Sequence, residues 1–422
     1  MTWGFETDAE FQQELDWIDA FIRTEVDPLE FVLEDPYDVT NSDFQRLVRP
    51  LQQIVKERGL WACHLGPDLG GQGFGQVKLA LMNEILGGAK FGPVVFGCQA
   101  PDSGNAEILA RYGTVEQREQ YLSPLLENHI VSCFSMTEPQ GGSDPTQIAT
   151  RAHRCSDGWR INGEKWFATN ASRAEFFIIM AATDPEAPPH RRMSAFIVPR
   201  ATSGIEIIRN SGYVAAQKTH AYLRLTDVRV PADHILGSPG EGFVVAQTRL
   251  GGGRIHHAMR TIAKARKALS YMQRRALSRT TQGELLARKQ MVQEKIADSW
   301  IELEQFRLLV LNTAWLIAKH QDDRKLRKDI AAVKAAMRKV LHDIASRALH
   351  VHGSLGLSDE MPFMHWVTES YFLGLADGPT EVHKITLAKE LLRDSGSDST
   401  SFPDYHVLER AAHAYKKYGV AP

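Results

Sequence analysis

The sequence of 422 residues predicts an α+β protein with an N-terminal all-α domain, a small β-barrel in the middle and a C-terminal four-helix bundle. Three observations favour this arrangement. Apolar residues recur at helical spacing before residue 130 and again after residue 240, short apolar runs separated by Pro and Gly lie between them, and the length exceeds one ordinary core. We expect domains at 1–130, 131–238 and 239–394, followed by a tail with a helix at 395–422.

Two amphipathic helices are expected in the first domain. The earlier one carries apolar residues at helical spacing and acidic residues near its start, and the later one runs from Asp43 to Arg58. Each should bury one face, formed by Phe11, Leu15, Ile18 and Ile22 in the first and by Phe44, Leu47, Leu51 and Val55 in the second.

The middle domain is expected to consist of short strands. Between Trp159 and Thr169, the dipeptide Asn162-Gly163 separates two apolar-rich arms and suits a two-residue hairpin turn. Further strand candidates lie at 176–180, 193–198, 204–208 and 222–230. Strands of this length, divided by Pro and Gly, are typical of a small β-barrel or sandwich.

The C-terminal domain is expected to be an antiparallel helical bundle, because its apolar stripes are long and strongly periodic. One stripe contains Ile330, Val333, Met337, Leu341, Ile344 and Ala348, and another contains Ile296, Trp300, Leu303 and Val310. After it, 395–401 has the composition of a loose linker, and a charged amphipathic helix should end the chain.

Composition excludes several classes of function. A net charge of −2 gives no reason to expect binding to nucleic acid or to an anionic membrane. No apolar run approaches the roughly 18 residues of a membrane span, and the chain ends show neither a secretory nor a peroxisomal signal. The four cysteines form no C-x-x-C pair and the histidines no metal spacing, so we expect a cytoplasmic protein without a metal site.

The stretch from Phe134 to Asp144 is the most informative in the chain. Small, hydroxylated and glycine residues follow a β-like run, and Pro139 ends that run. Such a loop exposes backbone N–H groups and lets a flat ligand approach the main chain.

Five motifs in order resemble the acyl-CoA dehydrogenase family and together span most of the chain. They are the glycine-rich loop at 65–75 and the segments 134–144, 164–170, 235–243 and 350–383. Gly253–Arg260 and Ala376–His383 look like the branch known as family members ten and eleven. The resemblance implies FAD as cofactor, an acyl-CoA substrate, an electron-transfer flavoprotein or similar acceptor, and a homodimer or a tetramer made of two dimers.

The resemblance also implies which residues contact the flavin. Those aligned with the ring contacts are Phe134, Met136, Thr137, Phe167 and Thr169, and those aligned with positions near the pyrophosphate and the pantetheine arm are Gly142 and Ser143. Contacts from a second subunit are expected from Arg279, Gln282, His350, Gly353 and Ser354, and further cofactor contacts from Pro379 and Glu381. Gln282 stands where the family usually has Phe, and His350 where it has Gln.

Asp377 is the candidate catalytic base. It aligns with the family's Glu, and a carboxylate removed from water gains the basicity needed to take the α-proton of a thioester. Gly378 and Arg254 align with substrate-contacting positions, as does Ser143. The other base position used in the family is Gly253 here, which carries no carboxylate and so strengthens the case for Asp377.

A polar stretch near residue 100 aligns with the acyl cavity. Gln99 and Asp102, with Ser103 and Asn105, make it unusually polar, which favours a polar or substituted acyl chain as substrate. Arg260 either reaches the CoA phosphates or is a solvated helix residue.

The leading interpretation is a FAD-dependent acyl-CoA dehydrogenase that makes trans-2-enoyl-CoA. An acyl-CoA oxidase, or a nitroalkane oxidase with Asp as base, is the nearest rival on the same scaffold. A flavin-bearing scaffold protein without activity is the rival from another class.

Overall fold

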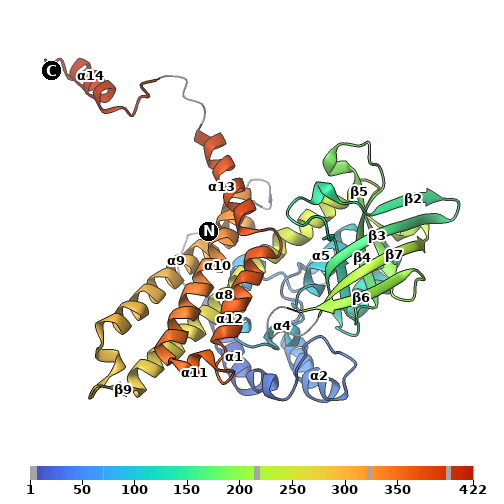
Figure 1. Cartoon of the computed structure of the whole chain (residues 1–422), viewed down its shortest axis with the longest axis horizontal. Helices are drawn as coiled ribbons and strands as arrows, with labels where there is room; N and C mark the ends of the chain where they lie inside the picture. Colours follow the sequence, from blue (N-terminus) through green and yellow to red (C-terminus); the bar gives the residue numbers. More distant parts are fainter. Residues whose placement is uncertain (1–6, 70, 213–218, 321–325, 396–400, 422) are drawn as a thin grey trace.

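The computed structural model describes residues 7–69, 71–212, 219–320, 326–395 and 401–421. Helical segments at both ends of the chain pack together, and a twisted sheet lies beside them (Figure 1). Most of the linker expected at 395–401 lies outside the described residues. No helix among the described residues is long and apolar enough to cross a membrane.

The N-terminal segment is helical, as predicted. Asp8 caps the first helix by accepting a hydrogen bond from Phe11 N at 2.8 Å, and Asn41 caps the second in the same way through Asp43 N and Phe44 N. The helices are α1 (Ala9–Phe21), α2 (Ser42–Glu57), α3 (Gly75–Leu86), α4 (Gly92–Val95), α5 (Asp102–Tyr112), α6 (Val115–Gln117) and α7 (Ser123–Leu126). The predicted apolar face of α1 is buried, and α2 buries Phe44 and Val55 of its predicted face.

The middle segment forms one open sheet. Its order is β6-β7-β3-β2-β4-β5-β8, with β1 parallel to β4. The strands are β1 (Ser132–Ser135), β2 (Arg151–Cys155), β3 (Gly158–Thr169), β4 (Phe176–Ala182), β5 (Met193–Pro199), β6 (Ile205–Ser211), β7 (His220–Val230) and β8 (Ile235–Leu236). All four predicted strands outside 159–169 are confirmed. The expected barrel is not: among the described strands no pairing joins β6 to β8, so the sheet stays open.

The predicted hairpin turn at Asn162-Gly163 is wrong, because β3 runs straight through it with an irregularity in register between Ile161 and Gly163. The turn lies earlier, at Ser156-Asp157, where Cys155 pairs with Gly158. Gly163 is required for a different reason. Its φ is 149°, and a Cβ there would lie 2.5 Å from Thr150 Oγ1.

The C-terminal segment is a bundle of long helices, as predicted. They are α8 (Gly242–Ser278), α9 (Gln290–His320), α10 (Arg327–His352), α11 (Ser354–Leu357), α12 (Phe363–Leu375), α13 (Thr380–Ser395) and the tail helix α14 (Val407–Tyr418), with a small hairpin of β9 (Thr280–Thr281) and β10 (Glu284–Leu285). The predicted stripe of α10 is fully buried. In α9, Leu303 and Val310 are buried, but Trp300 is 56% exposed because it lies outside the face that packs on this chain.

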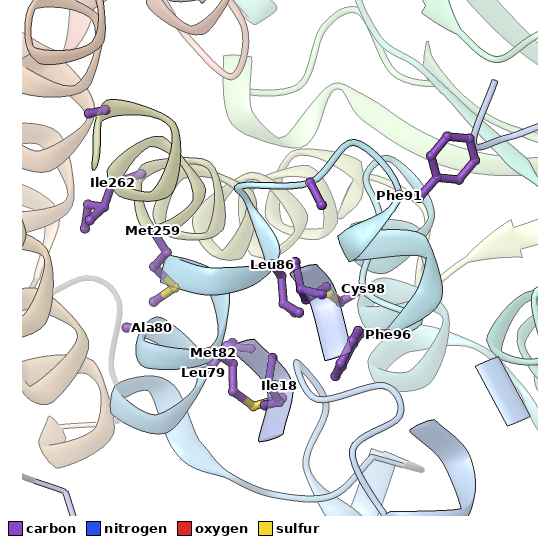
Figure 2. Packing of buried hydrophobic residues seen from close by; sticks show 14 of the residues in the cluster. Ile18, Leu79, Ala80, Met82, Leu86, Phe91, Phe96, Cys98, Met259 and Ile262 are labelled. Carbon is purple, nitrogen blue, oxygen red and sulfur yellow. The ribbon is translucent and has the colours of Figure 1, made fainter. Parts of the chain in front are cut away.

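One core joins the two helical segments. Helix α3 packs against α8 and α1 packs against α3, and Ile18, Met82, Leu86 and Met259 belong to this shared core (Figure 2). Gly87, at the end of α3, allows this contact, since a Cβ there would lie 2.6 Å from the backbone of Arg260. The N-terminal helices therefore fix the position of α8.

Candidate active site

Helix α8 carries one polar face toward the candidate base. Arg249, Gly253, Arg254 and His257 follow one another at intervals of four, one and three residues, which places them on one side of the helix. Three of these positions meet Asp377 directly. The site is therefore built around α8.

Asp377 lies in the turn between α12 and α13. Its φ is 54°, in the left-handed region that Asp tolerates better than most residues. Gly378 follows with a φ of 103°, and a Cβ there would lie 2.8 Å from His383 Nε2. The pair Asp-Gly is thus the local signal for this turn, which points the carboxylate at α8.

Three side chains hold or face Asp377. Arg254 Nε donates a hydrogen bond to the main-chain oxygen of Asp377 at 2.9 Å, and His383 Nε2 lies 3.2 Å from the same oxygen. His257 Nε2 lies 3.7 Å from the carboxylate oxygen Oδ2. The backbone of the turn is anchored, while the carboxylate faces an imidazole.

Gly253 leaves the space that this carboxylate occupies. A Cβ at residue 253 would lie 3.2 Å from Asp377 Oδ2. The alternative base position on α8 and the position of Asp377 therefore converge on one place in the molecule. This geometry supports a base supplied by Asp377 in place of a carboxylate at residue 253.

Two further cations lie close to this region, and the sequence did not identify either. The buried amine of Lys334, on α10, donates to the main-chain oxygen of Leu373, and burial lowers its pKa to about 8 while Asp377 acts in the opposite direction. Arg249 Nε donates to Asn105 Oδ1 at 2.7 Å, and its guanidinium lies 4.2 Å from the Phe134 ring. For Lys334, a charge beside the apolar stripe of α10 was the available signal.

The segment assigned to the flavin lines a small pocket that is open to solvent. Its walls include Met136, Thr137 and Gly142, with Glu138, Gly141, Asp144, Pro145, Gln147 and Ile148. Ser143 is exposed beside it. Because two glycines form part of the wall, a flat group can approach the backbone there, which fits a flavin.

Phe167 and Thr169 lie on β3, next to this segment. Phe167 has a φ of 51°, is 38% exposed and stacks on Trp166 with ring centroids 4.8 Å apart. Thr169 Oγ1 forms a hydrogen bond of 3.0 Å with His220 Nδ1, and the His220 ring lies 6.3 Å from Phe372 of α12. His220, which the sequence did not single out, thus joins the flavin-assigned strand to α12, the helix that ends two residues before Asp377.

A buried ion pair ties the two flavin-assigned segments together. Lys165 Nζ lies 2.7 Å from Glu138 Oε1 and also donates to Met136 O at 3.2 Å. Burial lowers the pKa of Lys165 to about 8 against the attraction of Glu138. Burial alone would raise the pKa of Glu138, but the ammonium and several hydrogen bonds outweigh it and hold that pKa below its usual value. The pair fixes the loop 136–138 against β3.

The residues assigned to a second subunit lie away from Asp377. Arg279 and Gln282 are exposed on the turn after α8, and His350, Gly353 and Ser354 are exposed where α10 ends. From Lys334 to His350 the rise of an α-helix gives roughly 24 Å. Pro379, just before α13, and Glu381, in its first turn, follow Asp377 closely in the chain. Within one chain, the residues assigned to a second subunit therefore lie apart from Pro379 and Glu381.

Gln99 and Asp102 lie where β1 begins. Asp102 Oδ1 accepts hydrogen bonds from Ser132 N at 2.8 Å and Ser132 Oγ at 2.6 Å, and Gln99 Nε2 lies 3.4 Å from Oδ2. Burial raises the pKa of Asp102 to about 6, although these hydrogen bonds oppose it. The carboxylate thus holds the strand that carries Phe134.

Arg260 adopts neither arrangement expected from the sequence. Its Nε donates to Asn83 Oδ1 at 2.8 Å and its Nη2 to Cys98 O at 2.5 Å. It therefore fastens α8 to α3 and to the stretch that precedes Gln99. The spacing of a basic residue along a helix does not reveal whether its partner is solvent, a phosphate or a carbonyl far away in the sequence.

We predict that losing one member of the Glu138–Lys165 pair is worse than losing both. Glu138→Gln or Lys165→Met should lower the free energy of unfolding by about 3–5 kcal/mol, since each leaves a buried group without its partner. The double variant should lose much less. Denaturant unfolding of the four proteins measures this, and additive losses would contradict it.

We also predict that stability falls as the pH drops from about 6.5. Burial lowers the pKa of both His257 and His383 to about 4, whereas unfolded histidine titrates near 6.5. Between these values the unfolded chain binds more protons, so the stabilisation is complete above pH 6.5 and is lost as the pH falls toward 4. Thermal unfolding at pH 7.5, 6.5 and 5.5 checks this, with His383→Gln expected to flatten the slope.

All three segments of the chain match known proteins. Sequence profiles of the acyl-CoA dehydrogenase N-terminal, middle and C-terminal domains match residues 8–129, 133–228 and 240–392. FadE2 of Mycobacterium tuberculosis, named as a candidate acyl-CoA dehydrogenase, is 38% identical over 83% of this chain and 87% of its own length. A candidate acyl-CoA dehydrogenase from Mycobacterium abscessus superposes with a TM-score of 0.85 at 36% identity, covering 93% of this chain and all of that one.

Two mouse proteins are similar as well. Acyl-CoA dehydrogenase family members 10 and 11 are 38% and 36% identical over 82% and 92% of this chain. The chain spans only 34% and 51% of their lengths. The chain therefore belongs to the acyl-CoA dehydrogenase family, and this membership supports a flavin-dependent oxidoreductase with FAD as its cofactor.

Proposed function

We propose that the protein dehydrogenates an acyl-CoA thioester between its α and β carbons, giving trans-2-enoyl-CoA as in fatty acid β-oxidation. The observation that carries the proposal is the carboxylate of Asp377, presented by a left-handed turn to the space that Gly253 leaves open. A carboxylate at residue 253 or at residue 377, the two base positions of the family, would reach this same space.

Asp377 takes the α-proton in this proposal, and the C–H electron pair moves into the new double bond. When bound, FAD accepts the β-hydrogen as hydride. Arg254 holds the turn through the main-chain oxygen of Asp377 and so limits how far the carboxylate can drift from the substrate. The flavin would be held by the segments 134–143 and 167–169, with Pro379 and Glu381 next to the base.

We further propose that two copies of the chain complete each cofactor site. The exposed residues Arg279 and His350 lie at the end of the bundle away from Asp377, which supports contacts to a cofactor of a neighbouring copy. A guanidinium at this surface suits bidentate binding of a diphosphate. A homodimer, or a tetramer of two dimers, and an electron-transfer flavoprotein as acceptor are parts of this proposal, and a cytoplasmic location stays a prediction.

The polar stretch supports a substrate whose acyl chain carries a polar group. Among the described residues, Gln99 Oε1 and His256 Nε2 are buried without a hydrogen-bond partner. Leaving such atoms unpaired costs free energy, so a ligand that satisfies them is favoured over one that does not.

The first experiment is anaerobic. Adding acyl-CoAs of graded length should bleach the flavin absorbance, and Asp377→Asn should slow bleaching by about 10²- to 10⁴-fold, because it removes the base. Asp377→Glu keeps the carboxylate and should retain part of the rate. If no acyl-CoA bleaches the wild-type flavin, the proposal fails. Hydrogen peroxide formed from a nitroalkane would then favour the oxidase, and no reaction with either would favour an inactive scaffold.

The second experiment compares hydroxylated and plain acyl-CoAs of equal length. We expect kcat/KM to favour a hydroxylated chain by about tenfold, the worth of one good hydrogen bond. Gln99→Leu should remove most of this preference and leave the plain chain little affected. A clear preference of the wild-type protein for the plain chain would overturn the polar-substrate proposal.

A further inference from the structure

His257 occupies a special place relative to the candidate base. It lies three residues after Arg254 on α8, so that both side chains point from one helix face toward the turn at Asp377. Its Nε2 lies 3.7 Å from Asp377 Oδ2, and the two side chains are only 22% and 16% exposed. Arg254 thus anchors the main chain of the turn while His257 faces its carboxylate.

The surroundings of His257 keep its imidazole neutral. Burial is the largest influence and lowers its pKa to about 4. Arg260, on the same helix, and Lys334, on α10, act in the same direction, whereas Asp377 and Glu369, on α12, oppose them. At neutral pH the ring therefore carries one N–H and no charge.

A neutral donor suits a carboxylate that must act as a base. A cation paired directly with the carboxylate would stabilise its ionised form and make it a weaker base. A neutral N–H can restrict the rotation of the carboxylate with less loss of basicity. The distance of 3.7 Å is longer than an ordinary hydrogen bond, and catalytic hydrogen bonds are often long before substrate binds.

We propose that His257 is a positioning residue, whose neutral Nε2–H orients the carboxylate of Asp377 toward the α-proton of the substrate. This inference rests on the proposed function, because it assigns Asp377 as the base. Nothing in the sequence pattern marked His257, which is one of two adjacent histidines on α8. The helix turns His256 toward His64 instead, with ring centroids 6.4 Å apart.

The test replaces the donor in two ways. His257→Leu keeps the bulk without an N–H, and His257→Gln keeps an N–H donor at similar reach. We expect His257→Leu to slow anaerobic flavin bleaching by on the order of 10- to 100-fold with little change in substrate affinity, the effect of a misplaced base. His257→Gln should recover most of the rate. His342→Leu, the same change at a half-buried histidine of α10 that faces Tyr371, is the matched control and should leave the rate unchanged.

A second readout does not need activity. Thermal unfolding of the wild-type protein, His257→Leu, Asp377→Asn and the double variant forms a cycle, in which contact between the side chains predicts non-additive shifts of the midpoint. Additive shifts overturn the contact. Equal bleaching rates of wild type and His257→Leu overturn the positioning role alone. If wild type is not bleached by any acyl-CoA, the proposed function falls and the positioning role with it, while the cycle still decides the contact.

Discussion

The hydrogen bond from Arg254 Nε to the main-chain oxygen of Asp377 is the interaction on which the arrangement of the site depends. It joins the longest helix of the bundle to a turn whose backbone is in a sparsely populated conformation. A non-glycine residue with positive φ needs such support from its surroundings. Here the guanidinium supplies it at the carbonyl, and the open space beside Gly253 leaves room for the carboxylate.

The flavin-assigned segments depend on a second constraint of the same kind. Lys165 and Glu138 are buried and paired, and Trp166 N donates to Thr137 O at 2.8 Å. A buried charge without a partner is costly, so the loop cannot move away from β3 without breaking the pair. Both constraints act through charged groups that bond to main-chain oxygens or to buried partners, and both therefore fix backbone positions.

Much of the fold could be predicted from local pattern. The stripe of α10 and the strands β4, β5 and β7 could be predicted because each buries apolar residues at the spacing of its element. The prediction of a hairpin turn at Asn162-Gly163 was wrong because this dipeptide is typical of hairpins. In the sheet, a glycine is required at residue 163 because a Cβ would collide with Thr150. The prediction that Trp300 is buried was wrong because periodicity does not show which neighbouring element, if any, covers an apolar face.

The sequence by itself determined the order of helical and strand segments and the motifs that resemble one family, because these depend on neighbouring residues and local spacing. It also marked Asp377, because this residue aligns with the Glu that serves as base in the resembled family. Only the tertiary structure decided that His257 faces this carboxylate, that His220 joins β3 to α12, and that Arg260 is bound to Asn83 and Cys98. These contacts link residues 51 to 177 positions apart, and no local pattern encodes a partner at such a distance.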